Sequence, residues 1–281
     1  MIELKDTGFS YSRKGVPALS GVTAIIPPGI HLLAGENGAG KTTLLHLIAG
    51  ISRPTEGECL IDGTPAASDN PSEIRRAFLL EENMKFPGKT IRDFAAMHSR
   101  FYPGFSQEAF ISNLMAFGLT GDEPMKSLSL GNRKKAQLSY ALALGTEVLL
   151  LDEPTNALDI QSKEILRRLL ANNLDDRQTV IVATHTVTEL DTLFDGAVMI
   201  TRSRLLFAAT EEAISARLAF RVGRVPDPEE IYSEIQIGRV LGITPASEDE
   251  EPTRVDWRLL YSALHSPQRD SILETLRKTE S

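Results

Sequence analysis

The sequence is short of cysteine and of long apolar runs, and both shortages limit where the chain can work. Cys59 is the only cysteine, so no disulfide can form within the chain and a reducing compartment is expected. No apolar run approaches the ~20 residues that a helix needs to cross a bilayer. The first six residues, MIELKD, lack the basic-then-apolar order of a signal peptide. These absences predict a cytoplasmic chain.

Positive charge is also in deficit. The chain has 30 Lys and Arg against 38 Asp and Glu, a formal net charge of −8 over 281 residues. Nucleic-acid binders normally carry a basic patch or stripe, so no nucleic-acid partner is expected. The same charge gives no attraction to anionic lipid, so any membrane association should run through a protein partner. Hydrophobic residues make up 42% of the chain, which is enough for a sizeable core.

The order of apolar segments predicts an α/β fold. Short apolar runs of strand length alternate with helical patterns, which indicates a parallel sheet flanked by helices. We expect strands at residues 30–34, 57–61, 148–151, 179–183 and 197–200, and helices at 40–49 and 160–172. Residues 90–144 have helical periods, with plausible N-caps at Thr90, Ser106 and Ser129. That stretch is predicted to be a helical insertion between the halves of the α/β core.

A glycine-rich turn carries the strongest chemical signal. Residues 35–42, GENGAGKT, match the P-loop pattern between a predicted strand and a predicted helix. Backbone N–H groups of such a loop and the helix N-terminus attract phosphates. Lys41 is expected to reach the β- and γ-phosphates, and Thr42 to offer its hydroxyl to Mg²⁺. The remaining cradle residues are expected to be Asn37, Gly38, Ala39, Gly40 and Thr43. A turn that merely caps a helix is the plainer alternative, which the flanking elements disfavour.

Two carboxylates follow the apolar strand at residues 148–151. Carboxylates at the carboxyl end of a parallel strand lie where open α/β sheets bind ligands. Asp152 is predicted to hold the Mg²⁺ shell, and Glu153 to polarise an attacking water as general base. A strand followed by a charged turn is common, but it is unexpected downstream of a P-loop.

At this point the sequence resembles the ATP-binding-cassette (ABC) ATPases over roughly residues 1–210. Residues 128–132, LSLGN, are similar to the LSGGQ signature of that family. In the family, the signature of one subunit faces the ATP held by its partner, which assigns Ser129 and Gly131 to the partner's nucleotide. Leu130 and Asn132 depart from the common motif, and dimer closure is expected to be weaker or differently tuned.

The resemblance implies roles for further residues. Tyr11 is similar to the aromatic that stacks on adenine. Glu81 lies where the family usually carries the Q-loop glutamine, with Glu82 adjacent, and implies a carboxylate that reaches Mg²⁺ or the water. Asp159 resembles the D-loop aspartate near the dimer seam, and His185 matches the switch histidine that contacts the γ-phosphate.

The resemblance implies a cassette at residues 1–218, with an antiparallel β-subdomain and a helical subdomain at about 88–145. Residues 219–281 are expected to form a small extension for packing, dimerisation or regulation. Its predicted helices are at 257–264 and 271–276. The cofactors would be ATP and Mg²⁺, and the partners a second identical or different cassette and an integral membrane transporter subunit.

Three hypotheses remain for what the ATPase drives. Residues 86–130, including FYPGF at 101–105, resemble subunits of bacterial exporter-like (ABC-2 type) systems, which implies a subunit on the inner face of the membrane that powers export. The second hypothesis is a soluble ABC ATPase that acts on a macromolecular complex. The third is a regulatory or interaction protein that uses its C-terminal extension.

Overall fold

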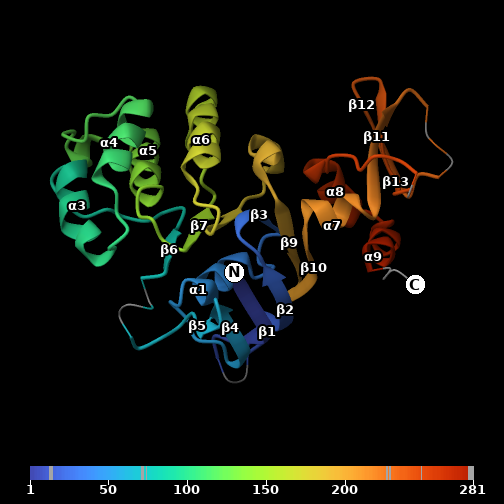
Figure 1. The fold of residues 1–281 in the computed structure, drawn as a ribbon, viewed down its shortest axis with the longest axis horizontal. Helices are drawn as coiled ribbons and strands as arrows, with labels where there is room; N and C mark the ends of the chain where they lie inside the picture. Colours follow the sequence, from blue (N-terminus) through green and yellow to red (C-terminus); the bar gives the residue numbers. More distant parts are fainter. Residues whose placement is uncertain are drawn as a thin grey trace.

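The centre of the molecule is a six-stranded sheet in which five neighbouring strands run parallel (Figure 1). The computed structural model describes residues 1–12, 15–70, 73, 75–225, 227, 229–247 and 249–277, apart from the side chain of Asn173. In spatial order the strands are β10 (Arg204–Thr210), β9 (Gly196–Thr201), β3 (Gly29–Ala34), β8 (Thr179–Ala183), β7 (Val148–Asp152) and β6 (Ala77–Leu80). Strands β7 and β8 are almost wholly apolar because both faces of the sheet are covered.

Alternate side chains of the sheet enter two separate cores. Leu149 and Leu151 pack into one, and Val148 and Leu150 into the other, as the two-residue period of a strand requires. The first core is covered by α5 (Leu130–Ala141) and α6 (Ile160–Asn173). The second is covered by α1 (Lys41–Ile48) and an antiparallel sheet. The central sheet is therefore the middle layer of the cassette.

The antiparallel sheet confirms the predicted β-subdomain. Its spatial order is β2 (Leu19–Ile26), β1 (Ile2–Phe9), β4 (Glu56–Ile61) and β5 (Thr64–Pro65). It lies below the central sheet in the view of Figure 1. Strand β1 pairs with β2 and β4, which brings the start of the chain beside segments that flank the P-loop.

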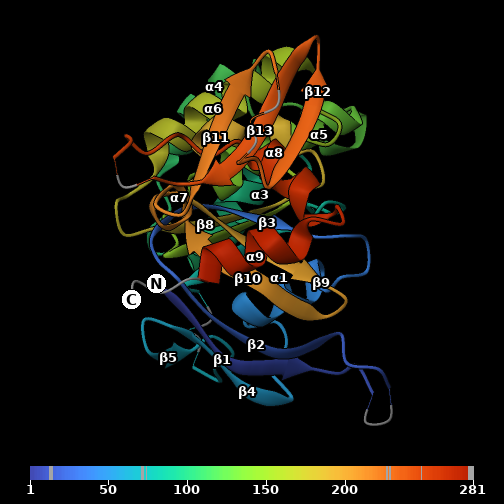
Figure 2. The same ribbon diagram turned by 90° about the vertical axis from the view of Figure 1, so that its right-hand side faces the viewer.

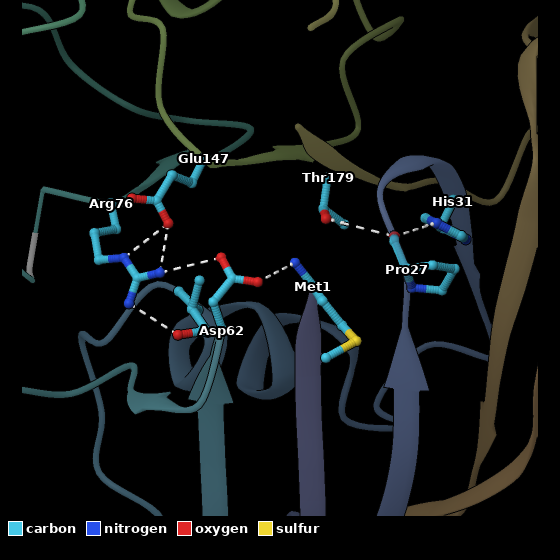
Figure 3. Close-up of polar contacts among 8 residues, drawn as sticks. Met1, Pro27, His31, Asp62, Arg76, Glu147 and Thr179 are labelled. Carbon is cyan, nitrogen blue, oxygen red and sulfur yellow. Dashed lines mark hydrogen bonds and ion pairs between the residues drawn. The ribbon is translucent and has the colours of Figure 1, made fainter. Parts of the chain in front are cut away.

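A polar cluster ties this β-subdomain to the central sheet (Figure 3). The Arg76 guanidinium donates to the Glu147 carboxylate at 2.5 and 2.8 Å, to Asp62 at 3.2 Å and to the Ile61 carbonyl at 2.8 Å. Asp62 in turn accepts from the Met1 amino group at 2.8 Å. Because the planar guanidinium reaches partners just after β4 and just before β7, it sets the relative position of the two sheets.

A second set of contacts in Figure 3 fixes the turn before β3. The Pro27 carbonyl lies 2.9 Å from His31 Nε2 and accepts from the Thr179 hydroxyl at 3.4 Å. His31 is buried, and this burial lowers its pKa despite the nearby carbonyl. The neighbouring strands β3 and β8 are thus locked together at their amino ends.

Helices fill the region between β6 and β7, as the periodicity predicts. They are α3 (Ile91–His98), the 3₁₀ turn η1 (Ser99–Phe101), α4 (Gln107–Ala116), the 3₁₀ turn η2 (Met125–Ser127) and α5. The predicted caps Thr90, Ser106 and Ser129 are confirmed, because each side chain accepts from the backbone N–H three residues later. These helices form one end of the molecule in Figure 1.

The C-terminal part forms the opposite end and contains a sheet that the sequence did not reveal. After α7 (Glu211–Ser215), three antiparallel strands pair in the order β11 (Leu218–Gly223), β13 (Arg239–Pro245) and β12 (Tyr232–Gln236). The two predicted helices are confirmed as α8 (Trp257–Leu264) and α9 (Arg269–Arg277). Figure 2 shows the three strands side by side, with α8 and α9 toward one end of them.

The extension packs on the segment that follows β8. That segment forms two 3₁₀ turns, η3 (Val187–Glu189) and η4 (Asp191–Leu193). The Trp257 ring is 1% exposed and meets Phe194 edge-on, with 6.2 Å between ring centroids. Arg254 donates to the Thr192 carbonyl at 2.8 Å. No helix within the described part of the chain has the length and apolar character to cross a membrane.

Replacing Trp257 tests how firmly this extension is docked. Trp257→Ala removes a large, fully buried side chain, and such truncations cost about 3–5 kcal/mol of stability. Urea denaturation should show a loss of that size. The control is Ile235→Ala in β12, whose side chain is 79% exposed and whose loss should change stability by less than about 0.5 kcal/mol. Equal stabilities of the two variants would contradict the packing described here.

Cys59 gives a second test of the fold, because its thiol lies inside the second core. It is 3% exposed on β4, and burial raises its pKa to about 12. Only the thiolate attacks thiol reagents. At pH 8 a disulfide reagent should therefore label native protein at least ~10³-fold more slowly than urea-unfolded protein. Cys59→Ser supplies the blank, and rapid labelling of the native chain would count against this burial.

Candidate functional site

A cavity of about 400 Å³ opens where the P-loop meets the acidic end of β7. It lies beyond the carboxyl ends of parallel strands, where open α/β sheets bind ligands. Its lining contains most of the residues that the sequence singled out: Tyr11, Asn37, Gly38, Gly40, Lys41, Thr42, Thr43, Asp152 and Glu153, joined by Ala18 and Glu82. Sequence reasoning named neither Ala18 nor Glu82 as a site residue.

The P-loop takes a conformation that favours glycine at the last of its three glycines, Gly40. Gly40 is the N-cap of α1 with φ of 107°, and a Cβ there would come within 2.6 Å of the Ala18 carbonyl. The Lys41 ammonium donates to the Gly35 and Glu36 carbonyls at 2.8 and 3.2 Å. Burial lowers the pKa of Lys41, and the attraction of Glu153 and Asp152 opposes this change. The loop thus places backbone donors and a cation on one side of the cavity.

Tyr11 stands at the rim of the same cavity. Its side chain is 71% exposed, its hydroxyl lies 3.1 Å from Thr43 Oγ1, and its ring meets Phe9 edge-on. An aromatic ring held in this way offers a surface on which a planar base can stack. The adenine contact of Tyr11 stays a prediction.

Glu153 and His185 are brought together, although 32 residues separate them. Glu153 Oε1 accepts from the His185 backbone N–H at 3.1 Å and lies 2.8 Å from His185 Nδ1. Its Oε2 accepts from the Thr184 hydroxyl at 3.0 Å. The Glu153 side chain is 13% exposed, and its φ of 45° is unusual for a residue other than glycine. A carboxylate fixed beside a phosphate cradle is well placed for general base catalysis.

Negative charge is crowded at this end of the sheet. Burial raises the pKa of Asp152, Glu153 and Glu82 raise it further, and Lys41 and Lys134 oppose the rise. A divalent cation at this position would relieve the repulsion between the carboxylates.

The residues at hand fit Mg²⁺. Thr42 and Asp152 bring a hydroxyl and a carboxylate to one cavity, and Mg²⁺ prefers such oxygen ligands. Within the described ranges, no group of three or more His, Cys, Asp and Glu side chains could hold a metal alone. Mg²⁺ is usually held by one or two carboxylates together with substrate phosphates. Thr42 and Asp152 are therefore the residues that would hold it, and it would neutralise charge on the phosphates.

Glu81 is not placed as the sequence reasoning expected. Its Oε1 lies 2.9 Å from His46 Nε2, and it is absent from the lining of the cavity. The neighbouring residue Glu82 faces the cavity instead, and its Oε1 accepts from Asn156 Nδ2 at 2.7 Å. Strand β6 ends at Leu80, and the Met84 N–H donates to the Glu81 carbonyl at 3.3 Å, so the two glutamates lie in a turn that sends their side chains to different partners. The geometry favours Glu82 for the role predicted for Glu81.

The signature-like segment does not contribute to its own chain's cavity. Ser129 caps α5 by accepting from the Asn132 N–H at 3.2 Å, and neither Ser129 nor Gly131 lines the cavity. A Cβ on Gly131 would approach the Ala157 carbonyl to 2.9 Å, so a glycine lets α5 begin close to the segment after β7. Leu130 is 67% exposed at this helix start. The helix N-terminus is thus a potential anion site that this chain itself leaves unused.

Comparison with known proteins agrees with this geometry. A family described as ABC transporter matches residues 19–156. The ABC transporter ATP-binding protein YtlC of Bacillus subtilis is 32% identical over 211 residues, which cover 72% of this chain and 80% of that protein. The energy-coupling factor transporter ATP-binding protein EcfA2 of Methanospirillum hungatei is 32% identical over 240 residues, covering 81% of this chain and 60% of that protein. The ribose import ATP-binding protein RbsA 2 of Streptomyces avermitilis is 30% identical, with coverages of 85% and 50%.

Solved structures share the fold. A dimeric ATP-binding cassette in a post-hydrolysis state, bound to ADP and Pi, has a TM-score of 0.63 at 24% identity, covering 75% of this chain and 98% of that one. A protein assigned as a cobalt transport ATP-binding protein has a TM-score of 0.66 at 22% identity. The latter match covers 97% of this chain and all of the other, so it includes the C-terminal extension.

The chain belongs to the ABC transporter family and is an ABC-type ATPase subunit. It spans 50–60% of the length of the RbsA 2 and EcfA2 relatives. The expectation of an exporter finds no support among these relatives, because the name that states a direction, that of RbsA 2, states import.

The assignment of Glu153 as general base predicts a separation of catalysis from binding. Glu153→Gln should lower ATP turnover by ~10²–10⁴, because it removes proton transfer while keeping side-chain shape. A fluorescent ATP analogue should bind within a few-fold of wild type. Glu164→Gln on α6, half-exposed and outside the cavity, should leave both quantities unchanged. Turnover near the wild-type rate in Glu153→Gln would refute the assignment.

Proposed function

We propose that this chain hydrolyses ATP at the seam of a cassette dimer and thereby powers solute uptake through a membrane-spanning partner. The observation that carries the proposal is the Glu153–His185 pair, of which Glu153 lines the P-loop cavity and His185 lies just outside its lining. Lys41 and the loop N–H groups neutralise phosphate charge, and His185 senses the γ-phosphate. Glu153 takes the proton of the attacking water.

The dimer completes the site. The cavity of one chain has donors on its P-loop side, and the capped start of α5 presents Ser129 and Gly131 away from its own cavity. In a head-to-tail pair, that start of α5 supplies Ser129 and further N–H donors to the partner's γ-phosphate. Two cassettes can thus share two nucleotides, whether the second cassette is identical or not.

The names of similar proteins favour import over export. The RbsA 2 protein is named for ribose import, and the chain is similar to it over 262 residues. EcfA2 is named for an energy-coupling factor transporter. We therefore place this subunit on the cytoplasmic face of a membrane protein that carries the solute inward.

In this proposal, two parts of the chain have different functions. Residues 1–218 form the cassette, with helices at about 88–145 that carry the signature-like segment. Residues 219–281 form an extension that packs on the segment after His185 through Trp257 and Phe194. We assign the extension to bracing that segment, with dimer contact or regulation as further roles of the same surface.

Deletion of the gene in its native host distinguishes the two directions. A tagged wild-type chain purified in mild detergent should bring down a polytopic membrane protein in stoichiometric amount.

Metabolite profiles of the deletion strain should show a solute whose concentration falls inside the cells while the solute stays in the medium. The Glu153→Gln chain should fail to restore uptake although it still co-purifies. Accumulation of a solute inside the cells would indicate export, and a dimer free of membrane protein would favour action on a macromolecular complex.

A further inference from the structure

The segment between β6 and α3 is tied to helix α5 by two buried side chains. Lys134 Nζ donates to the Glu82 carbonyl at 3.4 Å, and Gln137 Nε2 donates to the Met84 carbonyl at 2.5 Å. Lys134 is 4% exposed and Gln137 is 3% exposed. Because these two residues lie three apart on α5, they share one face of the helix. Helix α5, which starts at the signature-like segment, is therefore hydrogen-bonded to the backbone of the segment that carries Glu82.

Lys134 is an unusual group to bury. An ammonium that leaves water needs compensating charge or hydrogen bonds, and a single long hydrogen bond is poor compensation. Among the residues that the structure describes, Lys134 makes no ion pair within 4.0 Å. The negative charges that act on it are Glu82, Asp152 and Glu153, which oppose the lowering of its pKa by burial. Its charge balance is therefore with the carboxylates of the nucleotide cavity.

Glu82 is held from two directions. Its backbone carbonyl accepts from Lys134, and its carboxylate accepts from Asn156 Nδ2 at 2.7 Å. Asn156 belongs to the segment directly after Asp152 and Glu153. The Glu82 carboxylate thereby adds a further negative charge to a cavity that already contains two. Glu82 is exposed at the edge of the cavity, and a nearby cation reduces the repulsion between its carboxylate and the other two acids.

We propose that Lys134 is a positioning residue, whose buried charge and hydrogen bond hold Glu82 at the edge of the nucleotide cavity. It acts through Glu82 and touches no nucleotide itself. The inference rests on the proposed nucleotide site and adds a link within one chain, from the helix that serves the partner's nucleotide to the carboxylate that faces its own. A shift of α5 would move Glu82 with it, because Lys134 and Gln137 donate hydrogen bonds to the backbone of residues 82–84.

A double-mutant cycle tests the charge relation. Lys134→Gln, Glu82→Gln and the double variant are compared with wild type, and Lys85→Gln is the matched control from the same segment. Lys85 is exposed, so its replacement removes the same charge without the buried contact. ATP turnover, apparent KM and urea unfolding of the nucleotide-free protein are measured for each variant.

The cycle should be strongly non-additive. Lys134→Gln should lower kcat about tenfold with a much smaller change in KM, and in the Glu82→Gln background it should lower kcat little further, because residues within one hydrogen-bond network couple. Stability of the nucleotide-free protein should follow the same pattern, and Lys85→Gln should match wild type. Additive effects of the two changes on both kcat and unfolding would overturn the inference.

Two further outcomes are decisive. If Lys134→Gln does not fold, the double variant should recover folded protein, and failure of both to fold would refute a charge relation between the two positions. The unfolding measurement needs no nucleotide, so it judges the Lys134–Glu82 link even if Glu153→Gln shows that the proposed base is wrong. The two failures are thus distinguishable.

Discussion

The site depends on the parallel register of β3, β8 and β7. Leu33 pairs with Ala183, and Ala183 pairs with Asp152, so the three strands end at one level. The residues that follow are Gly35 and the P-loop after β3, His185 after β8, and Glu153 after β7. Because loops that leave adjacent parallel strands at the same edge lie side by side, one hydrogen-bonding pattern places the P-loop, the proposed base Glu153 and His185 together. The Glu153 N–H extends that pattern by donating to the Ala183 carbonyl at 2.8 Å.

Charge is the second constraint, and it opposes the first. The register that gathers these groups also brings Asp152, Glu153 and Glu82 to one cavity. Lys41 at the start of α1 and Lys134 on α5 belong to helices that cover opposite faces of the sheet, and both oppose the rise of the Asp152 pKa. A nucleotide with Mg²⁺ would enter a region in which these two lysines already offset part of the negative charge. The net charge of the chain says nothing about this balance, which depends on a few buried side chains.

Much of the fold follows from local signals. The P-loop, the apolar strands and the helix caps are short-range patterns, so the α/β core and the helical insertion were predictable. The sheet of β11, β13 and β12 was not, because its pairing depends on partners up to 27 residues apart that carry no strong alternation. Glu82 was missed for a different reason: similarity fixes a motif only to within a residue, whereas facing the cavity depends on which side of the chain a residue occupies. Lys134 had no sequence signal, since a lysine on a helix is normally solvated.

The proposal of import rests on similarity to a named relative and not on the nucleotide cavity. The residues that handle ATP are set by register and charge, which an importer and an exporter can share. Under the proposed function, the two would differ in the surface that meets a membrane partner and in the segments added to the cassette. Here the addition packs on η3 and η4, directly after His185, and Trp257 is its anchor. If the extension moved, Phe194 would move with it. The residues between Phe194 and His185 would then pass this movement to Glu153, which His185 contacts.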